Sequence, residues 1–221
     1  MSRAPAAADA LAAVAGYYGE RLRRFGATPL GVDWPHRPNQ ELRLLQLLRL
    51  CDFSAPCSLN DVGCGYGALR GLLSRRQRRA QIDYLGTDVS AAMVAAARRR
   101  WRRRADCAFE VAAGATRVAD YSLASGIFNV KLDCPLPDWE ALVARTLDNL
   151  RRHSRRGYAV NFIDPPAPGQ ASPPELYRPP AEQWLAHLAR HQPDCDVALL
   201  RGYGLPEYTL WVTPRSAAAA G

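Results

Sequence analysis

The chain has 221 residues, of which 48% are hydrophobic and 23% are charged, and its formal net charge is +8. This length and composition are typical of one globular domain with a sizeable core. No apolar run approaches the roughly 18 residues of a membrane span, and the N-terminus lacks a secretion signal, which argues against a membrane or secreted protein. The basic balance, almost all of it arginine, favours an acidic partner or reflects compositional bias.

The cysteine pattern points to a reducing compartment. The six cysteines form no C-x-x-C pair and no framework typical of a small disulfide-bonded domain. We therefore expect free thiols in a cytoplasmic protein.

The N-terminal quarter predicts two helices joined by an irregular loop. Residues 1–9 are rich in Ala and Pro and are expected to be frayed. Apolar residues at spacings of three and four predict a helix over residues 10–25. A Gly- and Pro-containing loop follows, and a second helix is predicted over residues 39–51, with Asn39 as its N-cap.

Three glycines in five residues mark the centre of the chain. An apolar strand is predicted to end near Val62, and a helix is predicted to begin at Ala68. The glycines allow a sharp turn and the close approach of a ligand to the backbone. The spacing is acid-x-G-x-G-x-G, with Asp61 as the acid, and Ala68 stands where a dinucleotide-binding loop has its third glycine. A carboxylate at this strand end disfavours a pyrophosphate and suits a cationic ligand.

A second acid follows at the expected distance. Residues 82–88 predict a short strand that ends in Asp88, about twenty residues after the glycines, where nucleotide-binding α/β folds place an acid on the ribose hydroxyls. The alternative is that Asp88 only caps the helix beginning near Ala91, with Ser90 as a rival cap.

From Asp61 to Gly67 the chain resembles, residue by residue, the signature loop of the class I S-adenosylmethionine-dependent methyltransferases. The resemblance is nearest to the small free-standing bacterial enzymes that act on metabolites. It implies an α/β/α Rossmann-like sandwich, with a seven-stranded, mostly parallel sheet whose last strand is antiparallel. It also implies S-adenosylmethionine as cofactor, bound by Asp61, Gly63, Cys64, Gly65, Tyr66, Gly67, Asp88, Val89, Ser125, Gly126, Tyr18 and Arg43.

The rest of the chain alternates strands and helices as this fold requires. Strands are predicted over 107–111 and 157–163, and the fourth strand with its following loop over 121–132. Helices are predicted over 138–153 (capped by Asp138) and 179–191, and a closing hairpin over 197–200 and 208–212. Ala112, Ala113 and Gly114 stand where many relatives carry a polar residue for adenine, so apolar and backbone contacts are expected there. The stretch from Pro165 to Pro180 is interpreted as a linker.

Two groups of residues are candidates for the acceptor side of the site. Ser125, Gly126 and Asn129 follow the fourth strand, and an amide such as Asn129 can orient an acceptor without titrating. The alternative for Asn129 is a turn residue that bonds its own backbone. By analogy with the family, Tyr17, Tyr18, Trp34 and Arg43 form a lid, with Arg43 a possible partner of the cofactor carboxylate. Core packing of the aromatics, and a solvated helix face for Arg43, are the alternatives.

Three other features are interpreted as structural. The arginine run from Arg98 to Arg104 invites a nucleic-acid interpretation, but is typical of a solvated helix end. Asp164-Pro165-Pro166 resembles a motif of nucleic-acid amino-methyltransferases, but follows the fifth strand and lacks the final aromatic. His187 and His191 have ligand-like spacing without further donors in view, so no metal is expected.

The sequence therefore predicts a lid segment over residues 1–57, a cofactor-binding domain over 58–214 and a flexible tail over 215–221. The predicted function is methyl transfer from S-adenosylmethionine to an oxygen or nitrogen of a small molecule. The alternatives are an RNA or protein methyltransferase that uses the basic surface, and a binding module without catalysis. Nucleic acid remains a possible partner, a membrane partner is not expected, and the sequence leaves the oligomeric state open.

Overall fold

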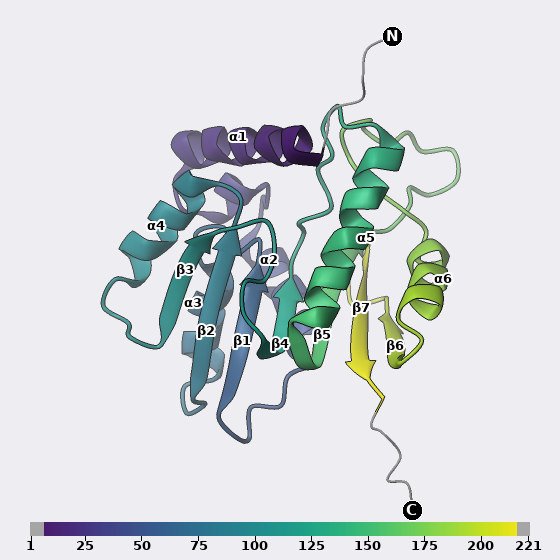
Figure 1. The fold of residues 1–221 in the computed structure, drawn as a ribbon. Coiled ribbons are helices and arrows are strands. Elements are labelled where there is room, and N and C mark those ends of the chain that lie inside the picture. Colours follow the sequence, from purple (N-terminus) through teal and green to yellow (C-terminus); the bar gives the residue numbers. More distant parts are fainter. Residues whose placement is uncertain (1–6, 216–221) are drawn as a thin grey trace, which may run out of the picture.

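The computed structural model describes residues 7–215 as a seven-stranded sheet between layers of helices (Figure 1). The elements are α1 (Ala7–Phe25), η1 (Pro29–Val32), α2 (Arg37–Leu48), β1 (Cys57–Val62), α3 (Ala68–Arg76), β2 (Ile82–Asp88), α4 (Ala91–Trp101), β3 (Cys107–Val111), β4 (Ala119–Ala124), α5 (Leu136–Arg152), β5 (Ser154–Ile163), α6 (Ala181–His191), β6 (Cys195–Leu200) and β7 (Glu207–Pro214).

The strand order is β3-β2-β1-β4-β5-β7-β6. The pairs from β3 to β5 are parallel, whereas β7 runs antiparallel to both β5 and β6. This confirms the predicted Rossmann-like sandwich and its antiparallel last strand. The chain moves outward from β1 to β3 and then returns to place β4 on the other side of β1. The carboxyl ends of β1 and β4 therefore form the switch point at which open α/β sheets bind ligands.

The two faces of the sheet are covered by different helices. One core joins α2, α3 and α4 to the sheet through buried residues such as Leu47, Leu72 and Val94. The other joins α5 and α6 to the sheet through residues such as Val143 and Trp184. Both layers exclude water from the strands, which leaves the carboxyl ends of the parallel strands as the open edge.

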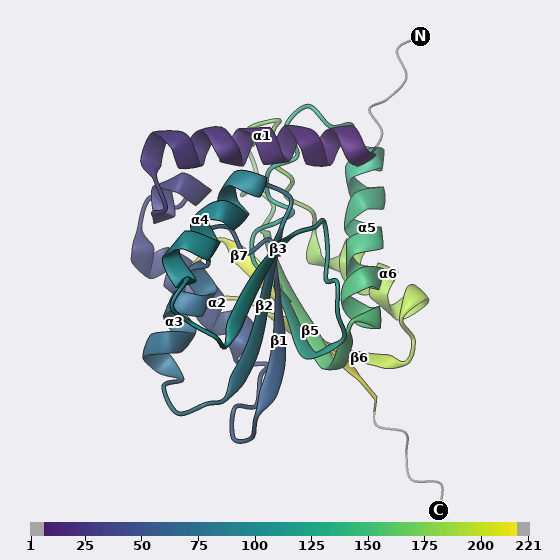
Figure 2. The same ribbon diagram turned by 60° about the vertical axis from the view of Figure 1, so that its left-hand side comes forward.

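Helix α1 lies across this edge, above the carboxyl ends of the parallel strands (Figures 1 and 2). It contacts α4 on one side of the sheet and α5 on the other. Ala10 and Val14 belong to the same buried core as α5. The predicted first helix thus covers the ligand-binding edge.

Several predicted boundaries were wrong. Helix α2 begins at Arg37 and is preceded by His36, so Asn39 is not its N-cap, because Pro38 fits the first turn, where no backbone donor is needed. Likewise α5 begins at Leu136 after Pro135, which places Asp138 in the first turn and not at the cap. Helix α1 begins at Ala7, so residues 7–9 are helical. The predicted tail, Arg215 apart, and residues 1–6 lie outside the described part of the chain.

None of the helices within residues 7–215 has the length and apolar character of a membrane span. All six cysteines are free thiols.

Candidate active site

A cavity of about 650 Å³ lies at the carboxyl ends of the strands, and residues of α1 line part of it. Its walls come from the segments that follow β1 to β4, from α1 and the α1–α2 connection, and from residues 175–176 and 205–207. Of the residues predicted for the site, the cavity is lined by Tyr17, Tyr18, Trp34, Arg43, Gly63, Gly65, Asp88, Val89, Ser125, Gly126 and Asn129. The fold therefore brings the glycine loop and the predicted lid together around one space.

The glycine loop is held in a conformation that requires glycine. Gly63, Gly65 and Gly67 all have positive φ angles, of 74°, 52° and 79°. A Cβ atom on Gly63 would lie 2.1 Å from Cγ2 of Ile127, across the gap between β1 and β4. The amides of Gly63 and Cys64 donate to the Thr87 carbonyl at 2.8 and 2.9 Å. The loop is thus tied to β2 and packs closely against the segment after β4.

Asp88 connects the glycine loop to the cavity. One carboxylate oxygen accepts from the Gly65 amide at 2.9 Å, and the other accepts from the Ser90 amide at 2.8 Å. Burial raises the pKa of Asp88, and these two backbone bonds act against that shift. Ser90 is the N-cap of α4, because its hydroxyl accepts from the Met93 amide. The interpretation of Asp88 as only a helix cap is therefore wrong, and each of its oxygens retains a lone pair for a ligand.

Asp61 lies behind the glycine loop. It is 2% exposed and accepts a hydrogen bond from the Tyr84 hydroxyl. Burial raises its pKa to about 7, against the opposing effect of that bond. Asp61 does not line the large cavity. With Cys64 and Tyr66 it lines an adjoining space of about 50 Å³, and Gly67 lines neither.

Arg43 is held in a buried ion pair that the sequence did not predict. Its Nε donates to Glu207 Oε2 at 2.8 Å, its Nη2 donates to the other carboxylate oxygen, and its guanidinium stacks 3.8 Å from the centre of the Trp34 ring. The side chain of Asn161 connects this pair to the backbone: its Nδ2 donates to Glu207 Oε2 at 3.0 Å, and its Oδ1 accepts from the Gly126 backbone amide at 2.8 Å. The interpretation of Arg43 as part of a solvated helix face is therefore wrong.

Gly126 lets this network approach the backbone. Its φ is 72°, and a Cβ there would lie 2.3 Å from Arg43 Nη1. Nη1 is thus the guanidinium nitrogen nearest the end of β4, while Nε and Nη2 are engaged by Glu207. A role for Arg43 toward a ligand carboxylate would rest on Nη1.

Asn129 lies in the cavity wall with one unsatisfied atom. The side chain is 9% exposed, and its amide oxygen Oδ1 is buried without a hydrogen-bond partner among the described residues. The backbone, in contrast, is satisfied: the Asn129 amide donates to Gly126 O, and the Tyr177 amide donates to Asn129 O. The Oδ1 atom does not bond the backbone of Asn129 itself, although the Asn129 backbone amide closes the turn that begins at Gly126.

The segment interpreted as a linker forms part of the cavity wall. Leu176 makes an antiparallel bridge with Val130, and the Lys131 amide donates to the Glu175 carbonyl at 2.8 Å. Sequence analysis missed Glu175 and Leu176, together with Asp33 and Glu207. Proline content obscured the first two, and no local pattern marks Glu207, because its partner Arg43 is 164 residues away. Asp33 stood beside a lid candidate, and its positive φ of 61° has no clear sequence signal.

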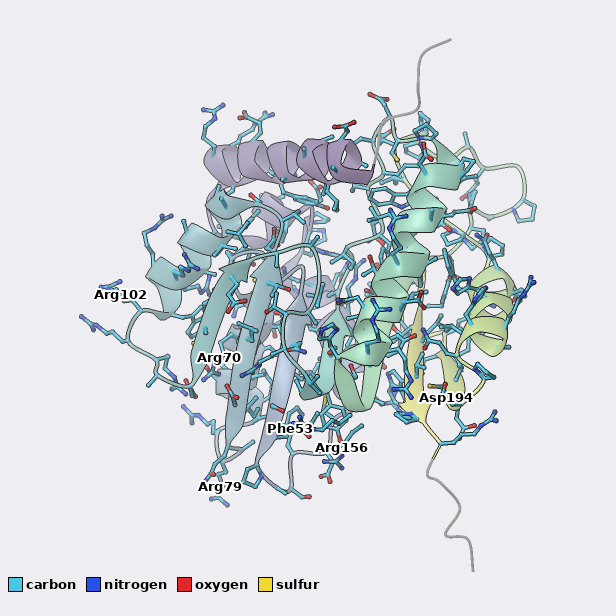
Figure 3. The ribbon with its side chains drawn as sticks, in the orientation of Figure 1. Phe53, Arg70, Arg79, Arg102, Arg156 and Asp194 are labelled. Carbon is cyan, nitrogen blue, oxygen red and sulfur yellow. The ribbon has the colours of Figure 1, made fainter. Side chains whose placement is uncertain are left out.

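The arginine run and the histidine pair lie outside the cavity. Arg98 donates to the Phe109 carbonyl, and the Trp101 indole donates to the Gly67 carbonyl, so part of the run is structural. Arg102, after α4, and Arg79, at the amino ends of the strands, point outward (Figure 3). The His187 and His191 rings stack at 4.4 Å. Within residues 7–215, no three His, Cys, Asp or Glu side chains are grouped to hold a metal ion.

Comparisons with known proteins agree with this geometry. Residues 60–157 match the family model of a methyltransferase domain. A Mycobacterium tuberculosis (strain ATCC 25618 / H37Rv) protein, provisionally named a methyltransferase, is 41% identical over 170 residues, which are 76% of this chain and 100% of that protein.

Solved structures share the fold at low identity. Magnesium protoporphyrin IX methyltransferase from Synechocystis PCC 6803, with bound S-adenosylmethionine, has a TM-score of 0.63 and 14% identity, over 93% of this chain and 97% of that one. Haemonchus contortus phosphoethanolamine N-methyltransferase 1 has a TM-score of 0.64 and 10% identity, over 92% of this chain and 49% of that one. The glycine loop, the sheet topology and the extended similarity to the mycobacterial protein lead to one conclusion: this chain belongs to the class I S-adenosylmethionine-dependent methyltransferase family.

Proposed function

We propose that the protein transfers a methyl group from S-adenosylmethionine to an oxygen or nitrogen of a small-molecule acceptor. The observation that carries this proposal is the single cavity that joins the glycine loop and Asp88 to Asn129 beneath α1. Its volume, about 650 Å³, lies within the usual range for small-molecule sites. We also propose a cytoplasmic location, because free thiols suit a reducing compartment.

The residues present fit the cofactor. Asp88 offers two carboxylate oxygens at the cavity wall, and hydroxyl groups such as those of a ribose are suitable donors to them. Apolar residues flank it, which suits a flat ring with contacts to apolar groups and backbone: Val89, Met93, Ala112 and Ala113. Gly63 and Gly65 allow close approach near the end of β1, and Gly126 with Arg43 Nη1 would hold the amino-acid end. The Asp61 carboxylate, which lies behind the glycine loop, would favour a cationic ligand through its charge.

Bound S-adenosylmethionine supplies an electrophilic methyl group on a sulfonium. The task of the chain is then to align the acceptor and exclude water. Asn129 Oδ1 is buried without a partner and would accept a hydrogen bond from an O–H or N–H of the acceptor. Because an amide does not titrate, this residue orients the acceptor and does not act as a base.

Calorimetric titration tests the cofactor assignment. S-adenosylmethionine and its demethylated product, S-adenosylhomocysteine, are expected to give saturable binding, whereas NAD is not, because Asp61 and the glycine spacing disfavour a pyrophosphate. The control is the Glu182→Gln variant, which lies on α6 outside the cavity and should bind both ligands as the wild type does. Saturable binding of NAD, with no response to either S-adenosyl compound, would contradict the proposal.

The segment before the domain is proposed as a lid. In this division, the described residues 7–57 cover the site and residues 58–214 bind the cofactor, whereas residues 1–6 and 216–221, the latter predicted as part of a tail, lie outside the described residues. Tyr17, Tyr18, Trp34 and Arg43 all line the cavity. Burial, together with the nearby Asp33 carboxylate, raises the pKa of Tyr18, so its hydroxyl stays protonated as a donor. A segment that covers a site can gate it.

Hydrogen exchange over residues 10–50 tests the lid. Amides in this segment are expected to exchange more slowly when S-adenosylhomocysteine is bound, because closure removes them from solvent. Amides of β5, which is central in the sheet, serve as the internal control and should change little. Equal protection of residues 10–50 in the free and bound protein would mean that they are ordinary packed structure.

The exposed arginines favour one alternative, an RNA acceptor. Arg99, Arg102 and Arg103 are exposed near the end of α4, away from the cavity lining. If they bind phosphates, heparin retention should fall steeply with moderate salt. A third possibility, cofactor binding without turnover, would follow if an acceptor screen gave no product despite tight binding.

A further inference from the structure

We propose that the acceptor carries a protonated amine, recognised by Asp33, Glu175 and Asn129 at the end of the cavity beneath α1. This deepens the proposed small-molecule methyl transfer and rests on it. The ammonium is the group that is recognised, and it need not contain the atom that is methylated.

The carboxylates of Asp33 and Glu175 lie in the same part of the cavity wall, near Tyr17. Tyr17, on α1, lies near both acids: burial raises the pKa of its hydroxyl most, Asp33 raises it further through a hydrogen bond and its charge, Arg21 lowers it, and Glu175 raises it least. Both acids line the cavity, although they come from segments far apart in the sequence. The tertiary fold thus brings two carboxylates to this wall, one of which is paired with Arg21.

Each carboxylate has at least one oxygen without a hydrogen-bond partner among the described residues. Asp33 Oδ1 lies 2.6 Å from Arg21 Nε, but the buried Asp33 Oδ2 has no hydrogen-bond partner among residues 7–215. Glu175 makes no side-chain hydrogen bond or ion pair with any residue between 7 and 215, although its backbone carbonyl holds the segment in place. A buried acceptor atom without a partner is costly, so a ligand that brings donors is favoured at this wall.

Asn129 gives independent evidence for a ligand with donor groups. Its side chain is more than nine-tenths buried, lines the same cavity, and leaves Oδ1 without a partner. The unsatisfied atoms of Asn129 and Asp33 are both acceptors. An ammonium offers several N–H donors and a positive charge, which matches this set, whereas a carboxylate or phosphate offers only acceptors.

Among the described residues, the cavity lining leaves no cation for an anionic acceptor, because Arg43 Nη1, which lies outside the pair with Glu207, is assigned to the cofactor carboxylate. Among the described residues that line the cavity, Arg43 is the one cationic side chain, and Glu207 engages it in a bidentate pair. The rest of the acceptor end is apolar and includes Leu11, Val14, Ile127, Phe128, Leu132 and Leu142. An apolar body that bears an ammonium therefore fits, and an anionic acceptor does not.

The test compares three probes that share one apolar body: phenethylamine, phenethyl alcohol and phenylacetate. Binding is measured by calorimetry near neutral pH, with the protein both free and saturated with S-adenosylhomocysteine. We expect the amine to bind about five- to tenfold more tightly than the alcohol, and phenylacetate to bind most weakly. Binding of the amine no tighter than that of the alcohol, including no detectable binding of the amine, overturns the assignment.

Variants test which residues recognise the ammonium group. Glu175→Gln is expected to weaken binding of the amine about two- to fivefold without changing binding of the alcohol, because Glu175 is exposed and an exposed charge contributes modestly. Asp33→Asn should weaken binding of the amine further. The variant is expected to fold, because Asn tolerates the positive φ at this position. Glu182→Gln is the matched control and should change no affinity. Amine preference that survives the Glu175→Gln/Asp33→Asn double variant would contradict the site.

The two proposals fail in different ways. If the protein binds no S-adenosyl compound, the proposed methyl transfer is wrong, while the amine preference of the free protein still decides the recognition site. If S-adenosylhomocysteine binds but the amine is not preferred, methyl transfer stands and the acceptor class is wrong.

Discussion

Arg43→Met is expected to lower the free energy of unfolding by about 3–5 kcal/mol, because it leaves the Glu207 carboxylate buried without its cation. Both side chains are almost inaccessible, at 2% and 3% exposure, so water cannot replace the lost partner. Glu207 would keep only the Asn161 amide as a donor. Denaturant unfolding of the variant and the wild type measures the difference.

Two further variants separate burial of a charge from loss of contacts. Arg37→Met removes an ion pair with Glu41 on the same helix, but Arg37 is 60% exposed, so the expected loss is about 1 kcal/mol or less. Adding Glu207→Gln to Arg43→Met should restore part of the stability, because the remaining group is neutral and still accepts from Asn161. A loss in Arg43→Met no larger than in Arg37→Met would refute the buried-pair account.

Asp88→Ala is expected to weaken binding of S-adenosylhomocysteine by about 10- to 100-fold. Hydrogen bonds from ribose hydroxyls to a charged acceptor contribute about 1.5–3 kcal/mol, and the variant also frees the Gly65 amide that Asp88 holds. Calorimetric titration of the folded variant measures this loss.

Ser90→Ala is the matched control for Asp88→Ala. Ser90 caps α4, so its loss should cost about 1 kcal/mol of stability while leaving cofactor affinity nearly intact. Circular dichroism establishes that both variants fold. If Asp88→Ala binds S-adenosylhomocysteine as tightly as the wild type, Asp88 has no ribose role, and its function is limited to ordering the glycine loop.

The sequence by itself determined the sheet, the glycine loop and the position of Asp88, because each depends on local chemistry. Apolar strands and amphipathic helices follow from hydrophobic periodicity, and glycine is favoured where φ is positive, as at Gly63. Helix starts were less accurate: prolines occupied first turns, and residues such as Asn39 and Asp138 resembled caps without acting as caps.

The charged groups of the cavity were decided only by tertiary structure. Whether Arg43 is free or paired depends on Glu207, which lies at the start of an antiparallel strand 164 residues away. In the same way, Glu175 reaches the site because a proline-rich segment bridges to Val130. Burial and electrostatic interaction depend on distance in space and not along the chain, so no local pattern could have revealed which carboxylate oxygens lack a partner among the described residues.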